Sequence, residues 1–96
     1  MREIDCSNLP DELADVALTA AEEYIEQKDC ETNGVKILRH SNLVVLNGDG
    51  RQIKRLFGGL QQAMGSSVQE SLHENHTMYS EEERLEYRHG LEFRKV

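Results

Sequence analysis

The clearest pattern in the chain is an apolar stripe with helical spacing between residues 11 and 28. Its members recur every three or four positions: Leu13, Val16, Ala17, Ala20, Ala21, Tyr24 and Ile25. This period is typical of an amphipathic α-helix that packs one side against a core. Asn8 is the predicted N-cap, and Pro10 and Asp11 suit the first turn. Asn33-Gly34 predicts the turn that follows the helix.

Two short β-branched runs follow, at Val35–Arg39 and Leu43–Leu46. The polar break between them, His40–Asn42, predicts a β-hairpin. A two-stranded hairpin alone is marginal in water. It therefore needs helices packed on it, a third strand from residues 91–96, or the edge of another subunit.

A second amphipathic helix is predicted from about Gly50 to Met64, with an apolar face at Ile53, Leu56, Phe57, Leu60 and Met64. Asp49 is its predicted N-cap, and Gln52 completes a capping-box pattern. The Gly58-Gly59 pair costs such a helix roughly 0.5–1 kcal/mol per glycine relative to alanine. The pair indicates either close packing or a kink, or simply a weak point in an ordinary helix.

Gly65–Ser67 predicts a break after this helix. Two Ser-x-x-Glu patterns, beginning at Ser67 and Ser80, predict short helices near 68–75 and 81–89. Gly90 should end the last helix, with residues 91–96 extended, although alternation over 85–93 also fits a strand. The expected fold is α+β: an N-terminal amphipathic helix, a β-hairpin, two to three helices and an optional C-terminal strand, in one small domain over 1–96.

Charge is ordered along the chain. Residues 1–34 hold two basic and ten acidic residues, a net charge of −8. Residues 35–66 hold five basic residues and one acidic residue, a net of +4. Residues 67–96 hold four basic and seven acidic residues, a net of −3, which gives −7 overall. Complementary surfaces attract and steer encounter, whereas like-charged surfaces repel. The acidic first helix therefore predicts a partner with a basic surface. The overall acidity, without interleaved aromatic residues, argues against direct nucleic-acid binding.

Composition bounds the class of protein. The hydrophobic fraction is 38 % and there is no Trp, so the core is lean and a homo-oligomer would help to complete it. No apolar run is long enough to span a bilayer, and the N-terminus has no signal-peptide pattern, so we expect a cytoplasmic protein. Cys6 and Cys30 are then expected to be reduced thiols, with a disulfide as the minor alternative.

Chemistry-bearing motifs are sparse. Glu70/His73 and Glu86/His89 repeat the Glu-x-x-His spacing of di-metal helix bundles. The second helix offers no further glutamate, so one chain cannot build such a site, although a dimer could. We expect no metal site and no cofactor. Nothing local activates either cysteine as a nucleophile. Asn47–Gly50 resembles a phosphate-binding turn only faintly, because Asp49 would repel an anion. We therefore expect no enzymatic activity.

We expect a small acidic protein-binding module, an inhibitor or adaptor of the kind that a phage or mobile element directs against a nucleic-acid-handling or defence complex. A row of carboxylates suits that role because it imitates phosphate spacing. Its predicted contacts are acids off the apolar stripe: Asp15, Glu22, Glu23 and Glu26. The alternative is an oligomeric binder of a small anion or nucleotide at the start of the second helix, with contacts at Arg51, Lys54 and Arg55. These cations would otherwise pair with the first helix or with Glu81–Glu83.

Overall fold

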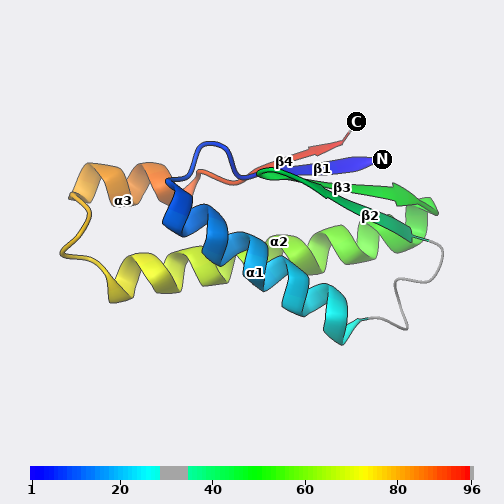
Figure 1. The fold of residues 1–96 in the computed structure, drawn as a ribbon, viewed down its shortest axis with the longest axis horizontal. Helices are drawn as coiled ribbons and strands as arrows, with labels where there is room; N and C mark the ends of the chain where they lie inside the picture. Colours follow the sequence, from blue (N-terminus) through cyan, green and yellow to red (C-terminus); the bar gives the residue numbers. More distant parts are fainter. Residues whose placement is uncertain (29–34, 96) are drawn as a thin grey trace.

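The structure is a computed structural model that describes residues 1–28 and 35–95. Over these residues the elements follow in the order β1 (Arg2–Asp5), α1 (Asp11–Gln27), β2 (Val35–His40), β3 (Leu43–Gly48), α2 (Gly50–Glu74), α3 (Glu81–Arg88) and β4 (Glu92–Lys95), as Figure 1 shows. The α+β class predicted from the sequence is confirmed, as are the first helix and the hairpin. The turn at Asn33-Gly34 and the state of Cys30 lie outside the described residues.

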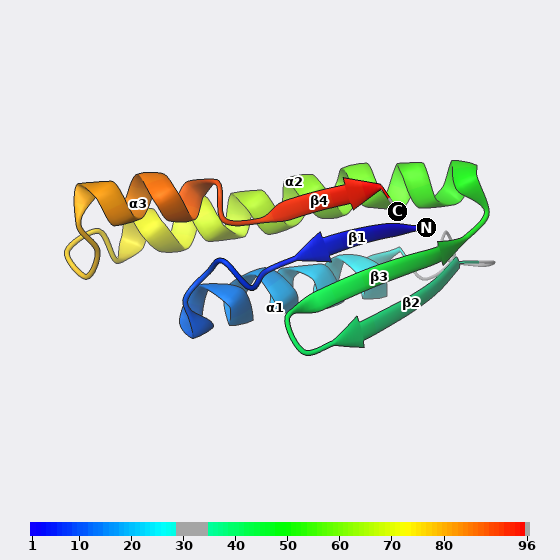
Figure 2. The same ribbon diagram turned by 90° about the horizontal axis from the view of Figure 1, so that it is seen from above.

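The strands form one antiparallel sheet in the order β2-β3-β1-β4. In it, Ile4 of β1 lies opposite both Val44 of β3 and Phe93 of β4. The chain passes through α1 from β1 to β2, and through α2 and α3 from β3 to β4, which is the split βαβ order of ferredoxin-like folds. Figures 1 and 2 show α1 and α2 on the same face of the sheet, and no helix of the described residues on the opposite face.

The core lies between this pair of helices and the sheet. The sheet contributes three buried side chains, Ile4, Val44 and Leu46, and the segment between β1 and α1 contributes Cys6 and Leu9. The helices contribute the rest of the described core, mainly Leu13, Ala17 and Leu18 from α1 and Ile53, Phe57, Leu60, Met64, Val68 and Leu72 from α2. Among the described residues no charged or polar side chain is buried, so the core is held by apolar burial alone.

A glycine sets how closely the two long helices approach. An ideal Cβ built on Gly59 of α2 would lie 1.8 Å from the Oη atom of Tyr24 in α1, whereas the same atom on Gly58 meets nothing within 4 Å. Of the two readings of the glycine pair, close packing therefore applies to Gly59. Gly58 is an exposed glycine in a helix interior.

The predicted break at Gly65–Ser67 is wrong, because α2 continues without interruption to Glu74. The separate helix expected near 68–75 is its last two turns. Val68 and Leu72 continue the four-residue spacing of Leu60 and Met64 and are buried with them. This continuous apolar stripe outweighs the local glycine and serine signals.

The start of α1 also differs from the prediction. Pro10, not Asn8, is at the N-cap, and it makes no side-chain capping hydrogen bond. The Asn8 side chain instead donates to Glu92 of β4. Leu9 is buried next to Gly90, where a Cβ would lie 2.5 Å from a Leu9 methyl carbon. The turn before α1 is therefore held by the packing of Leu9 on Gly90 and by the Asn8–Glu92 hydrogen bond. Both contacts join residues far apart in the sequence, so the local preference of asparagine for the N-cap did not predict them.

The last third of the chain follows the sequence closely. Ser80 forms the predicted capping box with Glu83, α3 ends just before His89, and residues 92–95 are extended. One prediction was that residues 91–96 add a third strand to the hairpin, but β4 does not pair with β2 or β3. Instead β1 is the third strand, next to β3, and β4 pairs with the other edge of β1. β1 was not predicted, because Ile4 is the one apolar residue in its four positions.

Candidate functional site

The outer side of α1 carries a row of carboxylates. The predicted partner contacts Asp15, Glu22, Glu23 and Glu26 are all exposed, and Glu12 extends the row towards the N-terminus. At 3.6 residues and 5.4 Å per turn, these side chains fall in a sector of about 100° and span about 21 Å of the helix. The structure therefore places all four predicted acids on one surface, which we call the acidic row (Glu12, Asp15, Glu22, Glu23 and Glu26).

The described residues offer the acidic row few compensating cations. α1 contains no basic residue, and three of the acids lie in its last six positions, where the helix dipole disfavours negative charge. Arg39 of β2 forms an ion pair with Glu22, and Glu12 accepts a 3.4 Å hydrogen bond from the Tyr79 hydroxyl. Within residues 1–28 and 35–95 no other ion pair reaches the row. The cation that links the basic segment 35–66 to α1 is thus Arg39, and not one of the predicted contacts at the start of α2.

An open groove of about 340 Å³ lies beside the row, between α1 and α2. Six residues line it: Asp15, Val16, Thr19, Ala20, Glu23 and Ser67. Val16 and Ala20 are half-buried rather than part of the core, so the groove has apolar surface between two carboxylates. The sequence pattern assigned both residues to the packed stripe, so the groove was not predicted. Both residues lie at the margin of the apolar stripe, next to the polar Thr19, and this position could have indicated that they are only partly buried.

The basic cluster at the start of α2 is exposed. Arg51, Lys54 and Arg55 lie in its first two turns, and none of them forms an ion pair within the described part of the chain. The pairing expected with the first helix or with Glu81–Glu83 is therefore not seen there. Asp49 caps the helix as predicted and accepts hydrogen bonds from the backbone N–H groups of Arg51 and Gln52. A carboxylate thus already occupies the donors that a bound anion would use.

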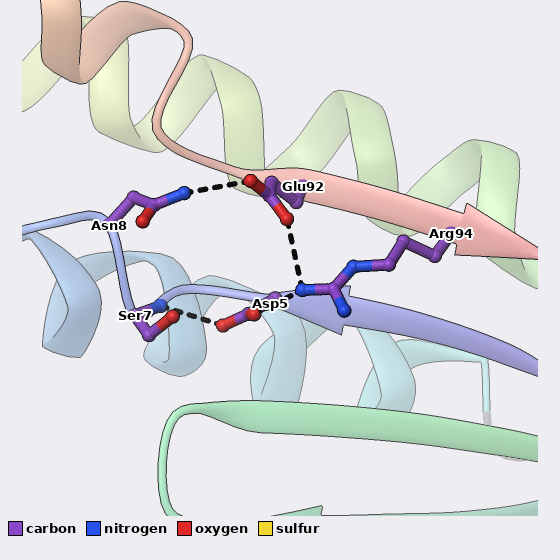
Figure 3. A network of polar contacts seen from close by, with 5 residues as sticks. All are labelled: Asp5, Ser7, Asn8, Glu92 and Arg94. Carbon is purple, nitrogen blue, oxygen red and sulfur yellow. Dashed lines mark hydrogen bonds and ion pairs between the residues drawn. The ribbon is translucent and has the colours of Figure 1, made fainter.

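A polar network joins β1, the turn after it and β4 (Figure 3). Asp5 accepts from the Ser7 backbone N–H at 2.9 Å and pairs with Arg94, which also contacts Glu92 at 2.9 Å. Asn8 donates to Glu92 at 2.9 Å. Hydrogen bonds from Ser7, and then the Arg94 charge, hold the pKa of Asp5 below its ordinary value. The network fastens the last strand to the first, so we assign it a structural role.

The Glu-x-x-His pairs do not come together. Glu70 and His73 share the end of α2, whereas Glu86 lies in α3 and His89 is its C-cap. Among the described residues no group of three His, Cys, Asp or Glu side chains is placed to hold a metal ion. His73 instead lines a second groove, of about 290 Å³, between α2 and α3.

Cys6 is fully buried in the core between β1 and α1. Burial raises the pKa of its thiol to about 11, with a further contribution from the Asp5 charge. A thiol in this state is protonated at neutral pH and is a poor nucleophile. Cys6 therefore contributes to the core as a small buried side chain with a free thiol.

The chain matches no family model, and no curated protein and no solved structure is significantly similar to it. The described helices include none with the length and apolar character needed to cross a membrane.

Proposed function

We propose that this protein is a non-catalytic binding module that uses the acidic row of α1, and the groove beside it, to hold a protein partner with a basic surface. An inhibitor or adaptor role suits such a module. The observation that carries the proposal is the groove itself, in which the apolar surface of Val16 and Ala20 lies between the carboxylates of Asp15 and Glu23.

This arrangement matches the chemistry of a lysine or arginine side chain. Both have a long aliphatic stem and a charged end, and they cover apolar surface with the stem while the end remains solvated or paired. In the groove, the stem would lie on Val16 and Ala20, and the cation would contact Asp15 or Glu23. Glu26, one turn beyond Glu23, offers a contact to a second basic residue of the same partner.

The placement of the acids supports a binding role over a purely structural one. Glu23 and Glu26 lie near the C-terminal end of α1, where their charge lowers helix stability by about 0.3–1 kcal/mol each. Neither forms an ion pair among residues 1–28 and 35–95 that would offset this cost. A partner that supplies the cations would offset it and would gain orientation and a faster encounter.

The structure favours this function over anion binding at the start of α2. The Asp49 carboxylate occupies two of the free N–H groups there and would repel an incoming phosphate. The three cations nearby are all exposed. We therefore treat Arg51, Lys54 and Arg55 as a secondary electrostatic feature.

Affinity capture from the source organism, with quantitative mass spectrometry, tests the proposal when the wild-type chain is compared with two matched variants. The first removes three charges from the row: Asp15→Asn, Glu23→Gln and Glu26→Gln. Glu22 is left intact because it pairs with Arg39. The control removes three exposed carboxylates from the C-terminal parts of α2 and α3: Glu70→Gln, Glu74→Gln and Glu86→Gln.

Both variants change the net charge equally, so a difference between them reports position and not total charge. We expect the row variant to lose partner affinity by roughly ten- to a hundredfold, since exposed charge contacts contribute about 0.5–1 kcal/mol each. The control variant should bind like the wild type, and binding should weaken with added salt. Equal capture by the wild type and both variants would refute the proposal.

A further inference from the structure

Among residues 1–28 and 35–95, nothing pairs with the outer edge of β2, which is six residues long. β2 is terminal in the sheet, and its inner side pairs with β3 from Val35 to His40 (Figure 2). At about 3.4 Å per residue, the free edge extends for about 20 Å and presents backbone N–H and C=O groups to solvent. The other sheet edge, β4, has only four residues.

The side chains of β2 do little to block this edge. Its helix-facing side chains are Val35, Ile37 and Arg39, and its open-face side chains are Lys36, Leu38 and His40. The strand contains no proline, glycine or acidic residue, and the Arg39 charge is already paired with Glu22. Leu38, in the middle of the open face, is 51 % exposed. An exposed aliphatic residue at the centre of a free edge favours strand pairing.

We propose that β2 pairs antiparallel with β2 of a second copy of this chain, so that the two four-stranded sheets become one. A twofold axis normal to the sheet keeps the open face of one copy on the same side as that of the other. Residues directly opposite across an antiparallel ladder share a face, so open-face residues must oppose open-face residues. This excludes every register that places Ile37 opposite the partner's Leu38.

The register that centres the axis on Leu38 meets these conditions best. Leu38 then lies opposite the partner's Leu38, Ile37 opposite the partner's Arg39, and Lys36 opposite the partner's His40. In this register no lysine or arginine lies directly opposite another lysine or arginine. The exposed leucines bury one another, and the backbone groups of both edges become paired.

The paired sheet would also present the binding surface twice. Both α1 helices would lie on the same face, one on each side of the axis, with Arg39 and the partner's Arg39 between the two acidic rows. These arginines reduce the repulsion between the rows. The interface is a single strand pair, well below the roughly 1,200–2,000 Å² of stable complexes, so we expect a weak dimer with a dissociation constant in the micromolar range.

Sedimentation velocity over a wide concentration range tests this assembly. The wild-type chain should shift reversibly from its 11.0 kDa protomer mass to twice that value. Leu38→Lys places like charges on the axis and should abolish the shift. Leu85→Lys is the matched control, because Leu85 is exposed to 54 % on α3, away from the edge; this variant should dimerise like the wild type.

Val45→Lys separates edge pairing from stacking of the two open faces. Val45 lies opposite Leu38 on β3, so its replacement would disrupt stacked faces and should leave an edge-paired dimer intact. In a Cys30→Ser background, Leu38→Cys should form an intermolecular disulfide under mild oxidation, and Leu85→Cys should not. A chain that stays monomeric at all concentrations, or a dimer that survives Leu38→Lys or is lost in Val45→Lys, would overturn the proposal.

Discussion

Gly58 and Gly59 are neighbours in α2, yet alanine at these two positions should have opposite effects on stability. At Gly58 the added methyl group meets nothing within 4 Å. At Gly59 it would lie 1.8 Å from Tyr24 Oη and 2.3 Å from Tyr24 Cζ, far inside van der Waals contact. The Tyr24 ring, half-buried between α1 and α2, would have to leave its position.

The sizes of the two effects follow from these contacts. Gly58→Ala gains helix propensity without a steric cost and should stabilise the protein by about 0.5–1 kcal/mol. Gly59→Ala gains the same propensity but pays for overpacking, about 1–3 kcal/mol, so its net effect should be a loss of about 1 kcal/mol. For a chain of this length, 1 kcal/mol corresponds to about 4–8 °C in Tm.

Urea unfolding followed by circular dichroism measures both changes, and a double-mutant cycle with Tyr24→Ala assigns their cause. Once Tyr24 is removed, Gly59→Ala should become stabilising, with a coupling energy of about 1–2 kcal/mol. Gly58→Ala should have the same effect in either background. Stabilisation by Gly59→Ala in the presence of Tyr24 would show that the close approach of α1 and α2 is incorrect.

Three further predictions concern single side chains. Asp49→Ala removes the α2 cap and should lower the free energy of unfolding by about 1 kcal/mol in urea titrations, and an unchanged midpoint would count against the cap. Because the Asp5 pKa is depressed in the folded state, its stabilising effect should be present at neutral pH and lost as pH falls through that pKa. Asp5→Asn should therefore destabilise the chain at neutral pH and not in strong acid; a pH-independent difference would contradict the lowered pKa of Asp5 and the contacts with Ser7 and Arg94 that cause it. Cys6, in a Cys30→Ser background, should resist iodoacetamide at mildly alkaline pH until denaturant unfolds the chain, because its pKa is about 11; rapid labelling of the native protein would contradict its burial.

Where the signal was local, the fold could be predicted from the sequence. The period of α1, the two runs of the hairpin, the Asp49 cap and the Ser80 capping box each lie within one element and depend on neighbours a few residues away. Such signals are reliable because sterics and short-range hydrogen bonds generate them directly.

The failures share a dependence on contacts distant in sequence. Arg2–Asp5 becomes a strand because β3 and β4 pair with both of its edges. Gly65 stays helical because Val68 and Leu72 are buried beyond it, and Asn8 turns to Glu92, 84 positions away. No local pattern contains this information.

The candidate site was predicted in part for the same reason. The acids of α1 could be identified because helical spacing alone places them on one side, away from the apolar stripe. The groove could not, because it depends on how far α2 covers the margin of that stripe. The way α1 and α2 pack together leaves Val16 and Ala20 partly exposed and places Ser67 at the same groove.

Carboxyl footprinting of the partner-bound protein tests the central claim most directly. A carbodiimide and an amine label exposed carboxylates, and mass spectrometry measures the modification of each in the free and bound chain. The acidic-row account predicts that Asp15, Glu23 and Glu26 become protected, while Glu70 and Glu74 at the end of α2 are labelled as before. Protection of Glu70 and Glu74 with unchanged labelling of the α1 acids would contradict it.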